Sequence, residues 1–187
     1  VSHPKYDRFE FQGVVITKEN LTKLYPDFDK LQIHYARYAH KETLKHGLTA
    51  GTEKAVASDI GTGHAAFVTT GTRNSTPINV RVLHAAPDNS ILLVHNHPNS
   101  SSFSPADLGA LSDYPSIIAM SIQAHDGTLY VAEIGSGSRM PLQDIDSMYN
   151  RIRRSGKYSG LTWEEESHRI IEELCNNYGW EYRRVSP

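Results

Sequence analysis

A short apolar run, Ser90–Val94, constrains the fold of this chain more than any other feature. It follows the turn-forming sequence Ala-Pro-Asp-Asn (86–89), and a proline stands four residues after it, at Pro98. Such a run without alternating polar residues is typical of a strand that is buried on both faces. We therefore predict an α/β protein in which helices sandwich a mixed β-sheet.

The remaining pattern supplies elements before, within and after that sheet. Apolar periodicity predicts a helix over 27–46 that Gly47 ends, and two C-terminal helices over 142–152 and 163–178. Short β-type segments predict strands at Phe9–Thr17, Glu53–Ser58, His64–Thr70, Ile78–Leu83, Ile117–Ala124 and Thr128–Ile134, with an edge strand at Trp180–Val185. We divide the chain into an N-terminal arm (1–27), a core (28–135) and a C-terminal helical extension packed on the core (136–187).

Charge and cysteine content exclude several classes of protein. Lys and Arg total 19 and Asp and Glu total 21, so the formal net charge is −2, and a strongly basic nucleic-acid-binding domain is not the default. Cys175 is the one cysteine, which rules out a disulfide within the chain and a cysteine-based zinc cage. The chain has 10 histidines, so any transition-metal site must use histidine and carboxylate ligands.

No targeting or membrane segment is visible in the sequence. The longest aliphatic run, Ile91–Val94, is far shorter than the roughly 20 apolar residues of a membrane-spanning helix. No signal peptide opens the chain, so we expect a cytoplasmic protein. The chain begins at Val1 without a methionine, so a fragment of a secreted toxin or of a phage protein remains an alternative.

Two histidines and one aspartate carry the strongest chemical signal. His95 and His97 are two residues apart at the end of the buried strand, and strand alternation places them on one face. Asp107 falls on the first turn of a helix that Ser104 and Pro105 begin, as N-cap and first helical residue. Two histidines and a carboxylate, with a fourth position left to water, are the ligands of a catalytic zinc site.

Each of these residues also has a structural explanation. The histidines fit two surface side chains after a core strand, Ser104 fits a helix N-cap, and Asp107 fits a favourable charge near the positive end of a helix dipole. The joint occurrence of all of them favours the metal site. His34, His40 and His46 are six residues apart on one helix and do not converge, so we expect them to face solvent.

The string His-Asn-His-Pro (95–98), followed by Ser104 and Asp107, resembles the JAB/MPN (JAMM) metalloproteases. Their motif is an upstream Glu, then His-x-His-Pro, a short loop and Ser-x-x-Asp. The loop here has six residues between His97 and Ser104 where the family usually has seven. The motif sequence is similar to that of the bacterial and phage branches of the family. These branches include RadC-like domains and domains attached to phage head-morphogenesis proteins and polymorphic toxins.

The resemblance implies a cytidine-deaminase-like architecture and one Zn²⁺ per chain, held by His95, His97 and Asp107. It also implies a catalytic Glu, which we assign to Glu53 rather than to Glu42 or Asp59, because Glu53 opens the first strand after the long helix. Zinc would polarise a water, Glu53 would carry its proton to the leaving amine, and Ser104 would stabilise the oxyanion.

We therefore expect a zinc metallopeptidase or isopeptidase, a hydrolase that cleaves an amide bond in a protein or peptide. The first alternative is a non-catalytic scaffold module of a phage particle or toxin. The second is a DNA-linked, RadC-like role, which only the RadC-like motif and the basic residues near the C-terminus indicate. We expect a protein or peptide substrate as the partner, and neither a membrane nor a nucleic acid. The sequence leaves the substrate bond and the oligomeric state open.

Overall fold

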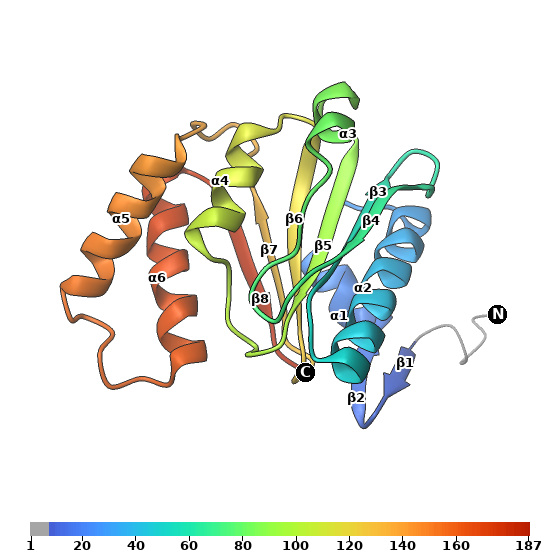
Figure 1. The fold of residues 1–187 in the computed structure, drawn as a ribbon, viewed down its shortest axis with the longest axis horizontal. Helices are drawn as coiled ribbons and strands as arrows, with labels where there is room; N and C mark the ends of the chain where they lie inside the picture. The colour runs from blue at the N-terminus through green and yellow to red at the C-terminus, as the bar shows by residue number, and fades with distance from the viewer. Residues whose placement is uncertain (1–7) are drawn as a thin grey trace.

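A six-stranded mixed sheet forms the centre of the structure, a computed structural model that describes residues 8–187 (Figure 1). The sheet has the strand order β4-β3-β5-β6-β7-β8. Its strands are β3 (Lys54–Asp59), β4 (Ala65–Thr70), β5 (Ile91–His97), β6 (Ile117–Ala124), β7 (Leu129–Glu133) and β8 (Glu181–Val185). β5 and β6 pair in parallel, and the other neighbours pair antiparallel.

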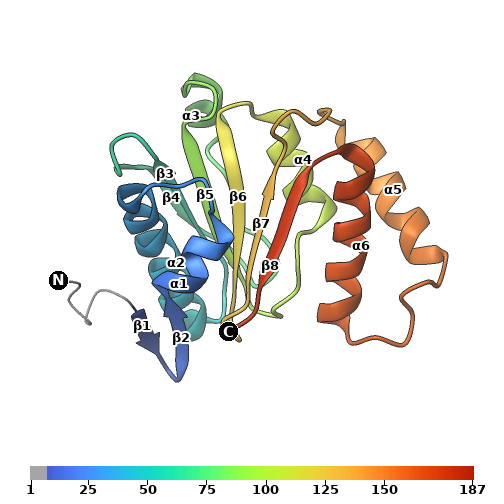
Figure 2. The same ribbon diagram turned by 180° about the vertical axis from the view of Figure 1, so that it is seen from behind.

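Helices cover both faces of this sheet, as Figures 1 and 2 show from opposite sides. They are α1 (Lys18–Leu24), α2 (Lys30–Ala50), α3 (Val80–Ala85), α4 (Pro105–Asp113), α5 (Leu142–Arg154) and α6 (Trp163–Tyr178). α1 and α2 pack on one face, α4 and α6 pack on the other, and α5 lies outside α4 and α6. The predicted α/β fold with a helix-covered mixed sheet is confirmed at this level.

Two hydrophobic cores follow from this layering, and β5 contributes to both. Leu92 and Val94 belong to the core beneath α1 and α2, whereas Ile91 and Leu93 belong to the core beneath α4–α6. All seven residues of β5 are buried, as the apolar run predicts. Because side chains alternate along a strand, the next odd-numbered positions also face α4, and position 96 faces α2.

Local caps define the ends of two helices and one turn. Ser104 is the N-cap of α4, as predicted, and the Thr162 side chain caps α6 by accepting a hydrogen bond from the Glu165 N–H. Gly179 ends α6 in the left-handed region at φ 70°. Gly127, at φ 95°, lies in the turn between β6 and β7, where Asp-Gly is a sequence typical of a tight hairpin.

The prediction for the long helix is wrong about its end and its buried face. α2 begins after Asp29, which forms a capping box with Gln32, and it runs through Gly47 to a left-handed Gly51. The buried face contains Ile33 and, contrary to expectation, a fully buried His40. The buried positions are Ile33, Ala36, Ala39, His40, Thr43, Leu44 and Gly47, whereas Leu31 and Tyr38 are exposed.

Two other predicted strands differ in the structure. Ile78–Leu83 is predicted as a strand, but Val80–Ala85 forms α3, because the Asn79 side chain accepts a hydrogen bond from the Val82 N–H and starts a helical turn. Phe9–Thr17 is predicted as one strand, but a turn at Gln12 and Gly13, both at positive φ, divides it into the hairpin β1 (Arg8–Phe11) and β2 (Val14–Thr17).

The predicted core and C-terminal extension share the six-stranded sheet, whereas β1 and β2 of the predicted N-terminal arm form a separate two-stranded sheet. β8, from the predicted C-terminal extension, pairs with β7 at the edge of the sheet, so the extension contributes a strand as well as α5 and α6. Residues 1–7 of the predicted N-terminal arm lie outside the described residues. Within 8–187, no helix combines the length and apolar character that a membrane span requires.

Candidate metal site

The candidate site lies where β5 ends and α4 begins. β5, α4 and β6 form a crossover unit with parallel strands, so the carboxyl end of β5 lies close to the first turn of α4. His95 and His97 occupy the last part of β5, and Asp107 is the third residue of α4. Ligand sites in open α/β sheets commonly form at this end of the strands.

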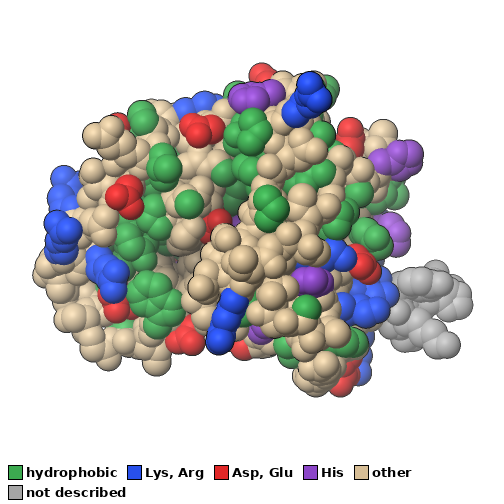
Figure 3. Space-filling view, in the orientation of Figure 1, with side chains coloured by type: hydrophobic (Ala, Val, Ile, Leu, Met, Phe, Trp, Pro, Cys, Tyr) green, Lys and Arg blue, Asp and Glu red, His purple; other side chains and the backbone are tan. Residues whose placement is uncertain are grey.

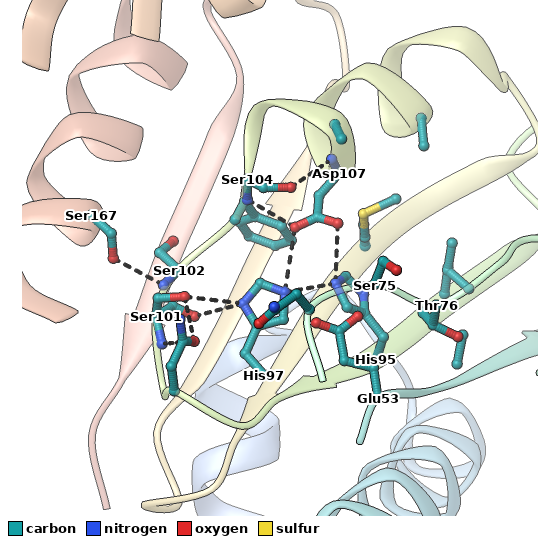
Figure 4. Close-up of a pocket in the computed structure, with 18 of the residues that line it drawn as sticks. Glu53, Ser75, Thr76, His95, His97, Ser101, Ser102, Ser104, Asp107 and Ser167 are labelled. Carbon is teal, nitrogen blue, oxygen red and sulfur yellow. Dashed lines mark hydrogen bonds and ion pairs between the residues drawn. The ribbon is translucent and has the colours of Figure 1, made fainter. Parts of the chain in front are cut away.

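The side chains of His95, His97 and Asp107 converge, as strand alternation predicts (Figure 4). The two Nε2 atoms are 3.0 Å apart. Asp107 Oδ1 lies 3.3 Å from His95 Nε2, and Asp107 Oδ2 lies 3.4 Å from His97 Nε2. Both imidazoles are buried. Within the described residues, this is the group of three or more His, Cys, Asp and Glu side chains that could hold a metal ion.

One donor atom from each of the three residues can reach a shared ion. The two Nε2 atoms are 3.0 Å apart, and each lies 3.3–3.4 Å from a different oxygen of Asp107. One such atom from each residue lies within 4.8 Å of the other two. Two nitrogens and one oxygen leave one tetrahedral position for a further ligand, which is the composition of catalytic rather than structural zinc sites. The donor set therefore fits zinc.

A backbone carbonyl fixes the orientation of His97. The carbonyl oxygen of Ser101 lies 3.0 Å from His97 Nδ1, which places the ring proton on Nδ1 and leaves the Nε2 lone pair free for a metal. Asn99 holds the loop in this shape, since its Oδ1 accepts hydrogen bonds from the Ser101 hydroxyl at 2.7 Å and from the Ser101 N–H at 3.2 Å.

The loop after β5 is also tied to the C-terminal part of the chain. The Ser102 N–H donates to Ser167 Oγ of α6 at 3.1 Å, and the Ser102 hydroxyl lies 2.8 Å from the hydroxyl of Tyr182 on β8. The Tyr182 hydroxyl lies 2.8 Å from His168 Nδ1 in turn. Residues of α6 and β8 thus support the loop that orients His97.

Glu53 joins the site from the neighbouring strand. It immediately precedes β3 and is 5% exposed. Ala55 pairs with His95 across the two strands, so Glu53, two residues earlier, lies on the same face as the imidazoles. Figure 4 shows its carboxylate directed toward them, with no hydrogen bond drawn to it. The structure thus brings Glu53 to the site, while Glu42 pairs with Lys54 instead.

Electrostatics give the two carboxylates different character. Burial raises the pKa of Glu53 above its usual range, and nearby His95 and His97 only partly oppose this effect. Burial also opposes ionisation of Asp107, but the charge of His95 and hydrogen bonds to both imidazoles outweigh it and hold the pKa of Asp107 well below its usual range. Asp107 is therefore suited to remain a charged ligand, and Glu53 is suited to exchange a proton.

Ser104 serves its helix directly. Its side-chain oxygen accepts a hydrogen bond from the Asp107 N–H at 3.1 Å, and its own N–H donates to Asp107 Oδ2 at 2.8 Å. The Ser104 hydroxyl retains its proton for donation, and the residue lines the cavity beside the histidines. The structure shows the N-cap role and leaves the oxyanion role as a prediction.

A cavity of about 330 Å³ opens beside these residues. Apolar side chains form much of its wall, including Leu93 and Met120 from β5 and β6 and Tyr149 and Trp163 from α5 and α6. Figure 3 shows the surface hollowed near the middle of this face, with hydrophobic side chains along the hollow's left border. Polar catalytic groups at one side of a largely apolar cavity are typical of substrate sites.

Sequence reasoning missed two supporting groups. The Ser101 carbonyl belongs to the backbone, so its residue type carries no signal. Asn96, however, is a polar residue within a strand predicted to be buried on both faces, and such a residue requires hydrogen-bond partners. Its amide bonds to the backbone of Thr52 and Lys54, on either side of Glu53.

Comparison with models of known protein families, with curated proteins and with solved structures finds no match to this chain.

Proposed function

We propose that this protein is a zinc-dependent metallopeptidase or isopeptidase that hydrolyses an amide bond in a protein or peptide. The observation that carries the proposal is the convergence of His95, His97 and Asp107, one donor atom from each lying within 4.8 Å of the others, with the carboxylate of Glu53 directed toward them. The resemblance of these residues to the JAB/MPN motif supports the same conclusion and extends the proposal to a JAB/MPN architecture.

The proposed reaction assigns a distinct task to each residue. His95, His97 and Asp107 hold the ion, which when bound supplies Lewis-acid chemistry that activates water for attack on a carbonyl. Glu53 accepts the proton of the attacking water and delivers it to the leaving amine, a role that suits its raised pKa. The Ser104 hydroxyl donates a hydrogen bond to the oxygen on which negative charge develops.

The DNA-linked alternative gains little from the two arginines of β8. Arg183 pairs with Glu133 at 3.1 Å, and Arg184 pairs with Glu165 at 2.5 Å. Both guanidinium groups are thereby neutralised within the protein, so β8 does not present a free basic strip to phosphates. The scaffold alternative is separated from the enzyme by the experiment below.

Metal analysis and hydrolysis assays test the proposal together. We expect about one zinc per chain in the wild-type protein, little zinc in His97→Ala, and full zinc in His34→Ala, which removes an exposed histidine on α2. A His97→Ala protein that keeps its full zinc contradicts the proposed ligand set.

A panel of peptides and ubiquitin-like fusions then tests catalysis. Glu53→Gln should keep its zinc and lose about 10²–10⁴-fold in hydrolysis, because the proton carrier is gone. Glu42→Gln is the matched control, since Glu42 pairs with Lys54 outside the site. Hydrolysis that survives Glu53→Gln contradicts the assigned role, and a zinc-loaded wild-type protein that cleaves nothing in the panel supports the scaffold alternative.

A further inference from the structure

We propose that Asn96, the residue between the two histidines, positions Glu53 for proton transfer. This inference rests on the proposed function. Asn96 is fully buried and faces α2, on the opposite side of β5 from His95 and His97. It therefore does not share the face of the metal-binding side chains, and its role must be exerted through the residues that it contacts.

The Asn96 amide holds the backbone on both sides of Glu53. Its Oδ1 accepts a hydrogen bond from the Lys54 N–H at 2.7 Å, and its Nδ2 donates to the Thr52 carbonyl oxygen at 3.0 Å. Glu53 is the single residue between these two anchors. Asn96 thus fixes the peptide segment from which the Glu53 side chain extends.

The hydrogen bonds from Asn96 take the place of strand pairing between β3 and β5, which does not reach Glu53. The pairing of β3 with β5 extends to Ala55 opposite His95, and Glu53 lies two residues beyond it. On its other side, Glu53 is bonded through its backbone, with its N–H donating to the Thr72 carbonyl and its carbonyl accepting from the Gly71 N–H. The side of Glu53 toward β5 depends on Asn96 instead.

The chemistry requires an asparagine at this position. One neighbour is a backbone donor and the other a backbone acceptor, so the residue needs an acceptor and a donor on the same short side chain. Aspartate offers no donor to the Thr52 carbonyl. The second amide proton of Asn96 reaches His125 Nε2 at 2.9 Å, and burial, aided by His97, lowers the pKa of His125, which suits a neutral ring that accepts.

Gly47 of α2 supports the same arrangement from behind. A Cβ atom at this position would overlap both Asn96 Nδ2 and the ring of His125. Glycine inside a helix costs about 1 kcal/mol relative to alanine. The glycine thus lowers the stability of α2 at the turn that faces the Asn96 amide. Gly47 is present because there is no room for a side chain, and not because the helix ends there as predicted.

Kinetics of Asn96→Ala and Asn96→Asp test this role. We expect kcat to fall by about 10–100-fold with little change in KM, because misplacing a catalytic group by about 1 Å has an effect of this size. Zinc affinity should remain within about threefold, since the three ligands are intact. Gln123→Ala is the matched control: Gln123 is a fully buried amide opposite Asn96 on β6, and its side chain bonds to His40 and the Ala124 carbonyl.

A double-mutant cycle separates positioning from general damage. In a Glu53→Gln background, Asn96→Ala should cause no further loss of kcat, because the group that it positions no longer carries a proton. An equal loss in both backgrounds would overturn the inference. Gly47→Ala tests the same contact without changing Asn96 itself, because the added Cβ atom would push the Asn96 side-chain amide aside. This variant should also lower kcat with little change in KM.

Hydrogen exchange of the metal-free protein tests the inference independently of activity. The Lys54 N–H should lose its protection in Asn96→Ala, whereas the Ala57 N–H, farther along β3, should keep it. If the wild-type protein shows no hydrolysis, the proposed function fails and this measurement still decides whether Asn96 fixes the segment. A Lys54 N–H that stays protected in Asn96→Ala refutes the role of Asn96.

Discussion

Ser104 and Asp107 hold each other through two reciprocal hydrogen bonds at the start of α4. The Asp107 N–H donates to Ser104 Oγ at 3.1 Å, and the Ser104 N–H donates to Asp107 Oδ2 at 2.8 Å. The same Asp107 oxygen lies 3.4 Å from His97 Nε2. The capping box that starts the helix therefore also sets the direction of the candidate ligand.

Ser104→Ala separates the cap from the chemistry. The substitution removes the side-chain acceptor, so the free energy of unfolding should fall by about 1 kcal/mol. The backbone N–H of residue 104 still holds Asp107, so zinc content should not change. Denaturant unfolding and metal analysis measure the two effects, and Ser104→Thr should restore the cap. Loss of zinc in Ser104→Ala would mean that Asp107 depends on the hydroxyl.

Asp107→Asn makes the complementary change. An asparagine at this position still accepts a hydrogen bond from the Ser104 N–H, so α4 should keep its start. The negative charge of the ligand is lost, and zinc affinity should fall by at least about 10-fold, the size of effect expected even for residues that only support a ligand. Isothermal titration with zinc measures this, and Asp113→Asn at the other end of α4 should bind as the wild type does.

His40 should make stability fall with acid. It is fully buried, with Nε2 2.8 Å from the Tyr25 hydroxyl and Nδ1 3.0 Å from Gln123 Oε1. Burial lowers the pKa of His40 to about 4. Between about pH 6.5 and pH 4, the unfolded chain therefore binds a proton at this histidine and the folded protein does not. This contribution to stability is complete above about pH 6.5 and is lost as the pH falls toward 4, by about 3 kcal/mol in all.

The test of this pH dependence is denaturant unfolding with a chelator present between pH 7 and 4.5. His40→Gln should flatten the dependence of the unfolding free energy on pH. His34→Gln, an exposed histidine on the same helix, should leave the wild-type slope unchanged. If the unfolding free energy depends equally on pH in all three proteins, the pKa of His40 is not lowered by folding.

Tyr182→Phe should weaken metal binding from a distance. The substitution leaves the ring in place but removes the hydroxyl that lies 2.8 Å from both Ser102 Oγ and His168 Nδ1. Two buried polar groups then lose a partner, so stability should fall by about 1–3 kcal/mol. Because Ser102 anchors the loop that orients His97, zinc affinity should fall by up to about 10-fold. Tyr178→Phe removes a hydroxyl on α6 away from that loop and should retain affinity.

The convergence of the candidate ligands was predictable because it depends on local rules. Strand alternation places His95 and His97 on one face, and the Ser-Pro start of a helix places Asp107 in its first turn. These rules involve a few consecutive residues. The contact from Ser101 to His97 uses a backbone carbonyl, so the residue type carries no signal for it. The contact from Asn96 to Thr52 depends on how two separate segments meet.

Two errors in the fold have different origins. Ile78–Leu83 has the composition of a strand, but the local cap at Asn79 and the burial of Leu83 favour α3. Gly47 resembles a helix end, yet it is retained within α2 because Asn96 and His125 occupy the space that a Cβ atom would need. In this second case, tertiary contacts override intrinsic preference.

The ties between Ser102 and the C-terminal elements have a consequence for the growing chain. Ser102 bonds to residues 65 and 80 positions farther along the sequence, on α6 and β8. A nascent polypeptide that has emerged only through α4 already contains all three donors and Glu53, but it lacks the partners that shape their loop. Because translation runs from the N-terminus, the candidate ligands can reach their final geometry only after the last strand has joined the sheet.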